Sequence, residues 1–209
     1  MQHLSDRLRR AMDQPLPGWD AHKKMINYDR PNPTEAQLIH PNARKGAVLA
    51  LLYPHQEKTF IALMKRNDYE GVHSGQVSLP GGKFEDDDKT LQNTALREAQ
   101  EEVGINQKSV EILGTLSPVY IPPSNFLVTP FLGISNNRPE FQTDPVEVAS
   151  LIEAPIDYLL RRDLLKEKPM FLQVFNTKVK VRYFDIDGHV VWGATAMILS
   201  EIKELILRT

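Results

Sequence analysis

Regularly spaced apolar residues predict four helices in this chain. From Leu91 to Val103 the apolar positions recur every four residues, which is the spacing of a helix face packed against a core. Gly104 follows directly, as expected of a glycine that ends a helix. This helix is predicted at residues 90–103, and the other three are predicted at residues 4–13, 156–166 and 195–207.

Shorter apolar runs, bounded by polar or turn-forming residues, predict strands on both sides of that helix along the chain. The first two runs form a predicted hairpin around His55 and Gln56, and the last two form another around Asn176 and Thr177. The predicted strands are residues 47–53, 59–65, 76–79, 110–113, 115–120, 126–134, 148–152, 170–175 and 179–186. Residues 20–44 are polar, contain three prolines and show no sustained period, so they are predicted to form an extended arm.

Composition limits the classes of protein that fit. A chain of 209 residues with 41% hydrophobic content suits one domain, expected at residues 45–209, with the helix and arm of residues 1–44 packed on it. The formal charge of −2 gives no general attraction to nucleic acid or to an anionic membrane, so neither is an expected partner. The absence of cysteine excludes disulfides and cysteine-zinc sites.

The beginning of the sequence bears on where the protein works. Its first ten residues lack the apolar core of a signal peptide. No apolar run approaches the ~20 residues that span a bilayer. We therefore expect a cytoplasmic protein, and the sequence leaves its oligomeric state open between monomer and homodimer.

The candidate chemistry lies on the helix at residues 90–103. Glu98, Glu101 and Glu102 stand at positions i, i+3 and i+4, so three mutually repelling carboxylates project from one patch. Carboxylates and backbone carbonyls are the ligands of hard divalent cations, which predicts a site for Mg²⁺ or Mn²⁺. Gly82, in the turn before the helix, lets the backbone approach such an ion and offer its carbonyl. Arg97 is placed to orient a carboxylate.

The stretch from Pro80 to Ile105 resembles the signature of the Nudix hydrolases. That signature consists of glycine, five residues, Glu, seven residues, Arg-Glu, an aliphatic residue, any residue, Glu-Glu, any residue, glycine and an aliphatic residue. The matching residues are Arg97, Glu98, Glu101, Glu102, Gly104 and Ile105, with Ala99 at the first aliphatic position. Asp88 takes the place of the early glutamate and lies one residue too far from Arg97, so no role is carried over to it.

The resemblance implies an α/β/α sandwich with a mixed β-sheet between helices. It also implies hydrolysis of a diphosphate linked to another moiety, with Glu98, Glu101, Glu102 and the main chain of Gly81 or Gly82 holding the metal ion. Family members often add an acidic residue from a distal loop, and Glu147 is the candidate here. The base that takes a proton from water stays open between Glu98, Glu101 and a distal acid such as Glu147.

The residues before the signature resemble the coenzyme A diphosphatase branch of this family. Matching positions are Leu63, Arg66, Gly75, Pro80, Gly81 and Gly82; departures are Ala62, Met64, Asn67, Gly71 and Leu79. The resemblance makes a nucleotide-cofactor small molecule, coenzyme A or an acyl-coenzyme A, the expected substrate. The candidate substrate contacts are Lys65, Arg66, His73 and Gly81. Two alternatives remain: a Nudix hydrolase of ADP-ribose, a dinucleotide or a nucleoside triphosphate, and a catalytically silent Nudix ligand-binding module.

Overall fold

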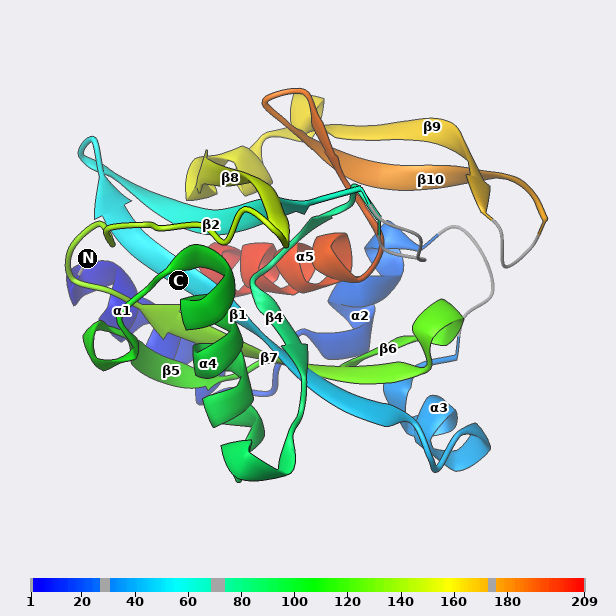
Figure 1. The fold of residues 1–209 in the computed structure, drawn as a ribbon. Coiled ribbons are helices and arrows are strands. Elements are labelled where there is room, and N and C mark those ends of the chain that lie inside the picture. The colour runs from blue at the N-terminus through cyan, green and yellow to red at the C-terminus, as the bar shows by residue number, and fades with distance from the viewer. Residues whose placement is uncertain (1, 27–30, 69–73, 173–175, 209) are drawn as a thin grey trace.

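The strands between residues 44 and 155 assemble into one mixed sheet of eight strands. The computed structural model describes residues 2–26, 31–68, 74–172 and 176–208 (Figure 1). Strand β1 (Arg44–His55) lies at the centre, parallel to β7 (Phe126–Ile134) and antiparallel to β2 (Lys58–Arg66). The main strand order is β3-β2-β1-β7-β5, and β4, β6 and β8 pair with β1, β7 and β2. The shorter strands are β3 (Val77–Ser78), β4 (Gly81–Lys83), β5 (Glu111–Thr115), β6 (Val119–Ile121) and β8 (Val148–Pro155).

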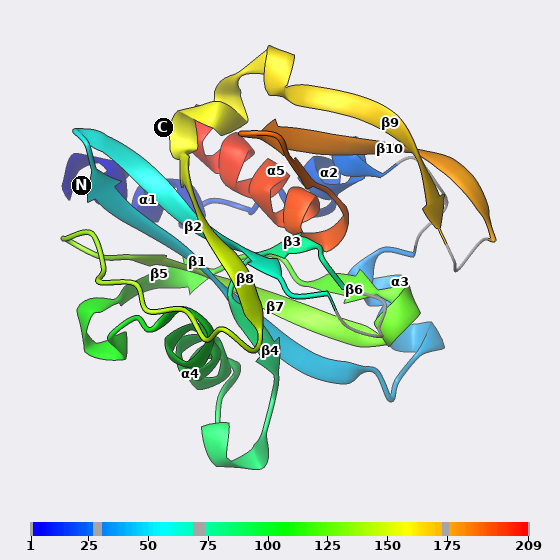
Figure 2. The ribbon, with the colours of Figure 1, turned by 45° about the horizontal axis from the view of Figure 1, so that its top comes forward.

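Helices α4 (Leu91–Val103) and α5 (Gly193–Leu207) cover opposite faces of this sheet (Figure 2). Alternate residues of β1 divide between the two cores: Leu49 and Leu51 pack on the α4 side, whereas Leu52 packs on the α5 side. The arrangement is the predicted α/β/α sandwich with a mixed sheet between helices. In the described part of the chain, no helix is long and apolar enough to cross a membrane.

Local sequence signals define both ends of α4. The Thr90 side chain accepts a hydrogen bond from the backbone N–H of Asn93, which makes Thr90 the N-cap. At the other end Gly104 adopts a φ of 74°, the left-handed conformation that ends the helix. The predicted helix at residues 90–103 is therefore confirmed.

The N-terminal segment differs from its prediction. Helix α1 (Gln2–Met12) confirms the predicted helix at residues 4–13. Residues 20–44, predicted to be extended, instead contain α2 (Gly18–His22), a 3₁₀ turn (Lys23–Met25) and α3 (Pro33–Ile39). These helices are too short to show a sustained period, and contacts with distant residues stabilise α2: the Ser200 hydroxyl on α5 donates to the Ala21 carbonyl.

The prediction of a helix at residues 156–166 is wrong. The chain forms two 3₁₀ turns, Ile156–Leu160 and Arg162–Leu164, and then enters strand β9 (Leu165–Leu172). Ile156 and Leu159 are buried three residues apart, a spacing that one turn of either helix type satisfies. Pairing of Leu165 with Phe184 then draws the chain into a second sheet, of order β11-β10-β9, with β10 (Thr177–Ile186) and β11 (His189–Val191).

Three further 3₁₀ turns connect the strands and helices of the core. They are Asp86–Asp88, Gln107–Ser109 and Pro122–Ser124. The first lies between β4 and α4, where the sequence has one residue more than the Nudix signature. The predicted hairpin of residues 170–186 is present as β9 and β10, and part of its connection lies outside the described residues.

Candidate active site

The glutamates of α4 face the glycine turn that begins β4, and they differ in exposure. Glu102 is 2% exposed, Glu98 is mostly buried and the Glu101 side chain is 58% exposed. Glu102 and Glu98 lie four residues apart on the helix side nearer the sheet, and Glu101 lies toward solvent. The three carboxylates of the predicted patch thus range from buried to exposed.

Glu102 is held between two strands of the sheet. Its Oε2 accepts a hydrogen bond of 2.7 Å from the backbone N–H of Gly81, and its Oε1 lies 3.2 Å from Nη1 of Arg66 at the end of β2. Oε1 makes an ion pair there but no hydrogen bond. Burial raises the pKa of Glu102 to about 7, although Arg66 and the Gly81 N–H oppose the rise. This carboxylate therefore binds a proton or a cation readily near neutral pH.

Glu98 lies directly against Gly82. A Cβ atom on Gly82 would stand 2.5 Å from Oε2 of Glu98, which no side chain tolerates unless the carboxylate moves. Burial raises the pKa of Glu98 above its ordinary value, and Arg97 lowers it in part. Gly81 is constrained differently: its φ is 150° and a Cβ there would meet the carbonyl oxygen of Ala47 at 2.3 Å. Gly81 thus keeps the backbone close to β1, and Gly82 leaves room for a carboxylate.

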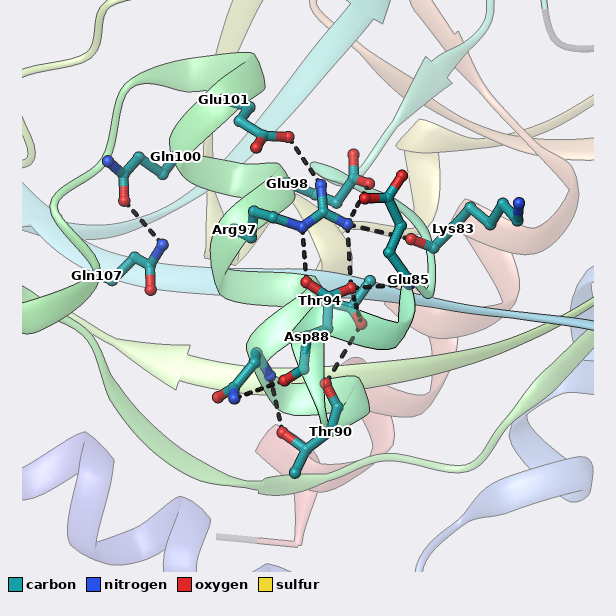
Figure 3. A network of polar contacts seen from close by, with 11 residues as sticks. Lys83, Glu85, Asp88, Thr90, Thr94, Arg97, Glu98, Gln100, Glu101 and Gln107 are labelled. Atoms are coloured by element: carbon teal, nitrogen blue, oxygen red, sulfur yellow. Dashed lines mark hydrogen bonds and ion pairs between the residues drawn. The ribbon is translucent and has the colours of Figure 1, made fainter.

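Arg97 fixes the orientation of two of the glutamates (Figure 3). Its guanidinium contacts Oε1 of Glu98 at 2.9 Å and donates to Oε2 of Glu101 at 2.8 Å. It is itself held by Asp88, which accepts from Nε at 2.7 Å and from Nη2 at 3.1 Å. The hydrogen bond from Arg97 keeps the pKa of Asp88 well below its usual range, so Asp88 stays ionised.

Asp88 is the functional residue that the sequence reasoning missed. Its carboxylate also accepts hydrogen bonds from the Thr94 hydroxyl and the Glu85 backbone N–H. The 3₁₀ turn Asp86–Asp88 accommodates the extra residue of the loop, so Asp88 still reaches Arg97 despite the longer spacing. The signal for this role was the presence of Arg97 and Thr94 within three turns of helix after Asp88, not the spacing to the glycines.

Arg66 brings the distal Glu147 to the same place. Its Nη2 lies 3.7 Å from Oε2 of Glu147, while its Nη1 faces Glu102. The loop that carries Glu147 is tied to β2 next to Arg66: the backbone N–H of Asn67 donates to the Glu147 carbonyl, and the Asn67 side chain donates to the carbonyls of Pro145 and Val146. Glu147 also contributes to raising the pKa of both Glu98 and Glu102.

One of the predicted substrate contacts, Lys65, is not brought to the glutamates, and another is not among the described residues. Lys65 is opposite Val77 of β3 in the antiparallel ladder, and Val77 packs in the core on the α5 side. Lys65 therefore projects from the face of the sheet opposite to Arg66 and Glu102. His73 lies outside the described residues.

The donor set fits a divalent cation, although it is not assembled as a finished cage. In the described ranges, no three acidic or histidine side chains converge closely enough to hold a metal ion. The buried Oε1 of Glu102 makes no hydrogen bond, and two mostly buried carboxylates with raised pKa values lie beside Gly81 and Gly82. Charge of this kind is compensated either by arginine, as Arg66 and Arg97 do here, or by a hard cation.

The chain is similar to a known protein family and to curated relatives. A family model described as the NUDIX domain matches residues 43–173. Among curated proteins, the chain is 33% identical over 171 residues to the uncharacterized Nudix hydrolase NudL of Yersinia pestis (strain Pestoides F). The match covers 82% of this chain and 84% of that protein. NudL of Yersinia pseudotuberculosis serotype O:1b (strain IP 31758) matches with the same identity and coverage.

Solved structures of Nudix proteins have a similar fold. The Nudix hydrolase RenU of M. smegmatis superimposes with a TM-score of 0.55 at 16% identity, covering 78% of this chain and 85% of that one. A MutT/nudix family protein of Enterococcus faecalis has a TM-score of 0.50 at 15% identity, with 88% and 64% covered. At these identities the likeness concerns the fold, which is the α/β/α arrangement described above.

Proposed function

The chain belongs to the Nudix hydrolase family, and we propose that it hydrolyses the diphosphate bond of coenzyme A or an acyl-coenzyme A. The products would be 4′-phosphopantetheine, acylated or free, and adenosine 3′,5′-bisphosphate. The observation that carries the proposal is the buried Glu102, which lies between Arg66 and the Gly81 N–H with one oxygen free of hydrogen bonds. Arg66 and Gly81 are also matching positions of the coenzyme A diphosphatase pattern.

Nudix hydrolases generally use divalent metal ions, and the fit described above supports one here, Mg²⁺ or Mn²⁺. Glu98, Glu101 and Glu102, with a main-chain carbonyl of Gly81 or Gly82, would hold the ion. When bound, such an ion neutralises diphosphate charge and lowers the pKa of water. Arg97, which is held by Asp88 and pairs with both Glu98 and Glu101, would orient these two carboxylates at the ion.

The protein's own groups supply position and charge. Arg66, near the end of β2, presents a guanidinium between Glu102 and Glu147, where it compensates negative charge and orients both carboxylates. Arg97 orients Glu98 and Glu101. The base that takes a proton from the attacking water is one of the acids at this site, with Glu98, Glu101 and Glu147 as the candidates.

Two of the proposed substrate contacts lie beside the glutamates, and a third projects from the opposite face of the sheet. Arg66 and Gly81 lie at the glutamates, which supports their role in contacting the diphosphate. Lys65 projects from the other face of the sheet, so it would reach only a part of the substrate that passes around the edge formed by β3. His73 is retained as a proposed contact on the resemblance alone. Asn67, a departure from the coenzyme A pattern, holds the loop of Glu147 instead of the substrate.

The experiment that tests this proposal compares substrates under identical conditions. Hydrolysis of coenzyme A, ADP-ribose, a dinucleotide and a nucleoside triphosphate is measured with Mg²⁺, with Mn²⁺ and with chelator. We expect coenzyme A to give the highest metal-dependent kcat/KM, with the two expected products identified by mass. Glu102→Gln, measured in parallel, separates turnover by this site from turnover by a contaminant.

Other outcomes would revise the proposal in different ways. A higher kcat/KM for ADP-ribose or another nucleotide would replace the substrate and leave the family assignment unchanged. Metal-dependent turnover of none of the four would favour a silent ligand-binding module. Equal turnover with chelator and with metal would show that the reaction requires no metal ion.

A further inference from the structure

The hydroxyl of Ser78 is buried and unpaired. Among the residues that the structure describes, three buried side-chain polar atoms make no hydrogen bond: Nδ1 of His22, Oγ of Ser78 and Oε1 of Glu102. Buried polar groups in native proteins are nearly always hydrogen-bonded, so each exception requires a physical explanation. Ser78 lies on β3 just before the glycine turn, Glu102 lies on α4, and His22 belongs to α2 in the N-terminal segment.

The strand ladder fixes the direction of the Ser78 side chain. Ser78 is opposite Met64 of β2, and Met64 packs in the core on the α4 side. Its neighbour Val77 packs on the α5 side, as alternation along a strand requires. The Ser78 hydroxyl therefore lies on the face of the sheet that α4 covers with its glutamates.

The Glu102 carboxylate lies beside the segment that contains Ser78. The carbonyl of Gln76, two residues before Ser78, accepts from the backbone N–H of Arg66, whose guanidinium faces Oε1 of Glu102. Three residues after Ser78, the N–H of Gly81 donates to Oε2 of Glu102. The Glu102 carboxylate thus lies between Gly81, three residues after Ser78, and the side chain of Arg66, whose backbone is paired with Gln76, two residues before Ser78.

We propose that the Ser78 hydroxyl holds the water molecule consumed in the hydrolysis, which makes Ser78 a positioning residue of this site. The proposal rests on the proposed function. A cation accounts for a carboxylate oxygen such as Oε1 of Glu102, but a neutral hydroxyl that both donates and accepts is better suited to water. A buried water needs at least two polar partners, and we assign this role to the Ser78 hydroxyl and the Glu102 carboxylate, which lie on the same face of the sheet and each have a buried oxygen without a hydrogen bond. Fixing this oxygen for attack on phosphorus lowers the barrier without changing substrate affinity.

The test compares Ser78→Ala and Ser78→Thr with a matched control. Ser150→Ala removes an exposed serine of β8 that is opposite Lys65, on the other face of the sheet. With the best substrate and metal, we expect Ser78→Ala to lower kcat about 100-fold at unchanged KM. Ser78→Thr, which keeps a hydroxyl, should retain most of kcat, and Ser150→Ala should equal the wild type.

A second readout does not depend on activity. Because the Ser78 hydroxyl makes no hydrogen bond to the residues that the structure describes, Ser78→Ala should change the thermal midpoint in chelator by no more than about 2 °C. A larger drop would show that the hydroxyl supports the fold, and a raised KM at unchanged kcat would show that it contacts substrate; either result overturns the proposal. Normal kinetics of Ser78→Ala in an active enzyme would reject Ser78 alone, whereas an inactive wild type would reject the proposed function.

Discussion

Two buried glutamates lie on opposite sides of the same sheet, in opposite chemical circumstances. Glu201 of α5 is fully buried, and its carboxylate accepts hydrogen bonds from the N–H groups of Gly18 and Ser117, from the Ser117 hydroxyl and from Nε2 of His22. Burial alone would raise the pKa of Glu201, but the hydrogen bonds from His22 and Ser117 outweigh it and hold the pKa below its ordinary value. Within the described part of the chain, Glu102 accepts a hydrogen bond only from the Gly81 N–H, and burial raises its pKa to about 7.

The contrast shows how burial serves either structure or chemistry. A carboxylate whose oxygens are satisfied by the protein stays ionised and joins segments, as Glu201 joins the N-terminal segment to α5. A buried carboxylate with an oxygen that accepts no hydrogen bond, such as Glu102, keeps the capacity to bind a proton or a cation. The two residues therefore make opposite predictions for activity and for stability.

The largest expected effect is on activity at Glu102. Glu102→Gln should lower kcat/KM by about 10³-fold, roughly 4 kcal/mol of transition-state stabilisation, because it removes a charge that holds the metal ion. Its unfolding free energy in chelator should match or exceed that of the wild type, since a poorly satisfied buried charge is lost. Steady-state kinetics and urea unfolding check the two halves. Normal kcat/KM in this variant would contradict the site assignment.

Glu201→Gln should lower stability and leave activity unchanged. Removing this charge breaks the buried pair with His22 and mismatches the donors of Gly18 and Ser117, so the unfolding free energy should fall by about 3 kcal/mol. At a temperature where the variant is folded, kcat/KM should stay near the wild-type value. Unchanged stability would contradict the structural role of Glu201. A loss of activity in the folded variant as large as that of Glu102→Gln would show that Glu201 and Glu102 do not differ in role.

The two neighbouring glycines are also expected to differ: Gly81 supports stability, and Gly82 supports metal binding. Gly81→Ala should destabilise the protein by about 2 kcal/mol, because its left-handed φ and the Ala47 carbonyl leave no room for a methyl group. In Gly82→Ala the atoms nearest to the added methyl belong to the end of the Glu98 side chain, which can shift at little cost, so stability should hold while metal affinity falls. Thermal unfolding and Mn²⁺ titration measure the two effects. Equal loss of stability in both variants would contradict this reading.

The smallest effect is a pH dependence of stability in chelator. The pKa of Glu102 is about 7 in the folded protein and near 4.3 when unfolded, so its protonated form favours folding. This contribution is complete below pH ~4.3 and is lost as the pH rises toward 7, at about 1.4 kcal/mol per unit within that window. The wild type should therefore lose stability relative to Glu102→Gln between pH 5 and 6.5, a range of about 1.5 units. A constant difference across the range would mean that the pKa is not raised.

Local signals account for what the sequence predicted well. Helix α4 carries its own periodicity, N-cap and terminal glycine, and the spacing of Glu98, Glu101 and Glu102 is fixed once that helix forms. Strand β7 was predicted at its observed bounds because its residues are mostly apolar and follow a turn. Such features require only neighbours along the chain.

Contacts between distant residues account for the failures. Helix α2 is stabilised by Glu201, 179 residues from His22, so its five residues carry no signal of their own. Lys65 and Arg66 are adjacent in sequence but project from opposite faces of the sheet, and only the pairing of β2 with β3 reveals which one faces α4. Asp88 reaches Arg97 because a 3₁₀ turn takes up the extra residue, which a count of spacings does not show.

Metal binding by the Glu102 carboxylate is central to the function proposed for this site. Mn²⁺ is titrated by calorimetry into wild type, Glu102→Gln and Glu201→Gln, without substrate and at a temperature where circular dichroism shows all three folded. We predict that Glu102→Gln weakens Mn²⁺ binding at least ~10-fold, by the loss of one charged oxygen ligand, while Glu201→Gln binds as the wild type does. Equal Mn²⁺ affinity in wild type and Glu102→Gln would contradict the central claim.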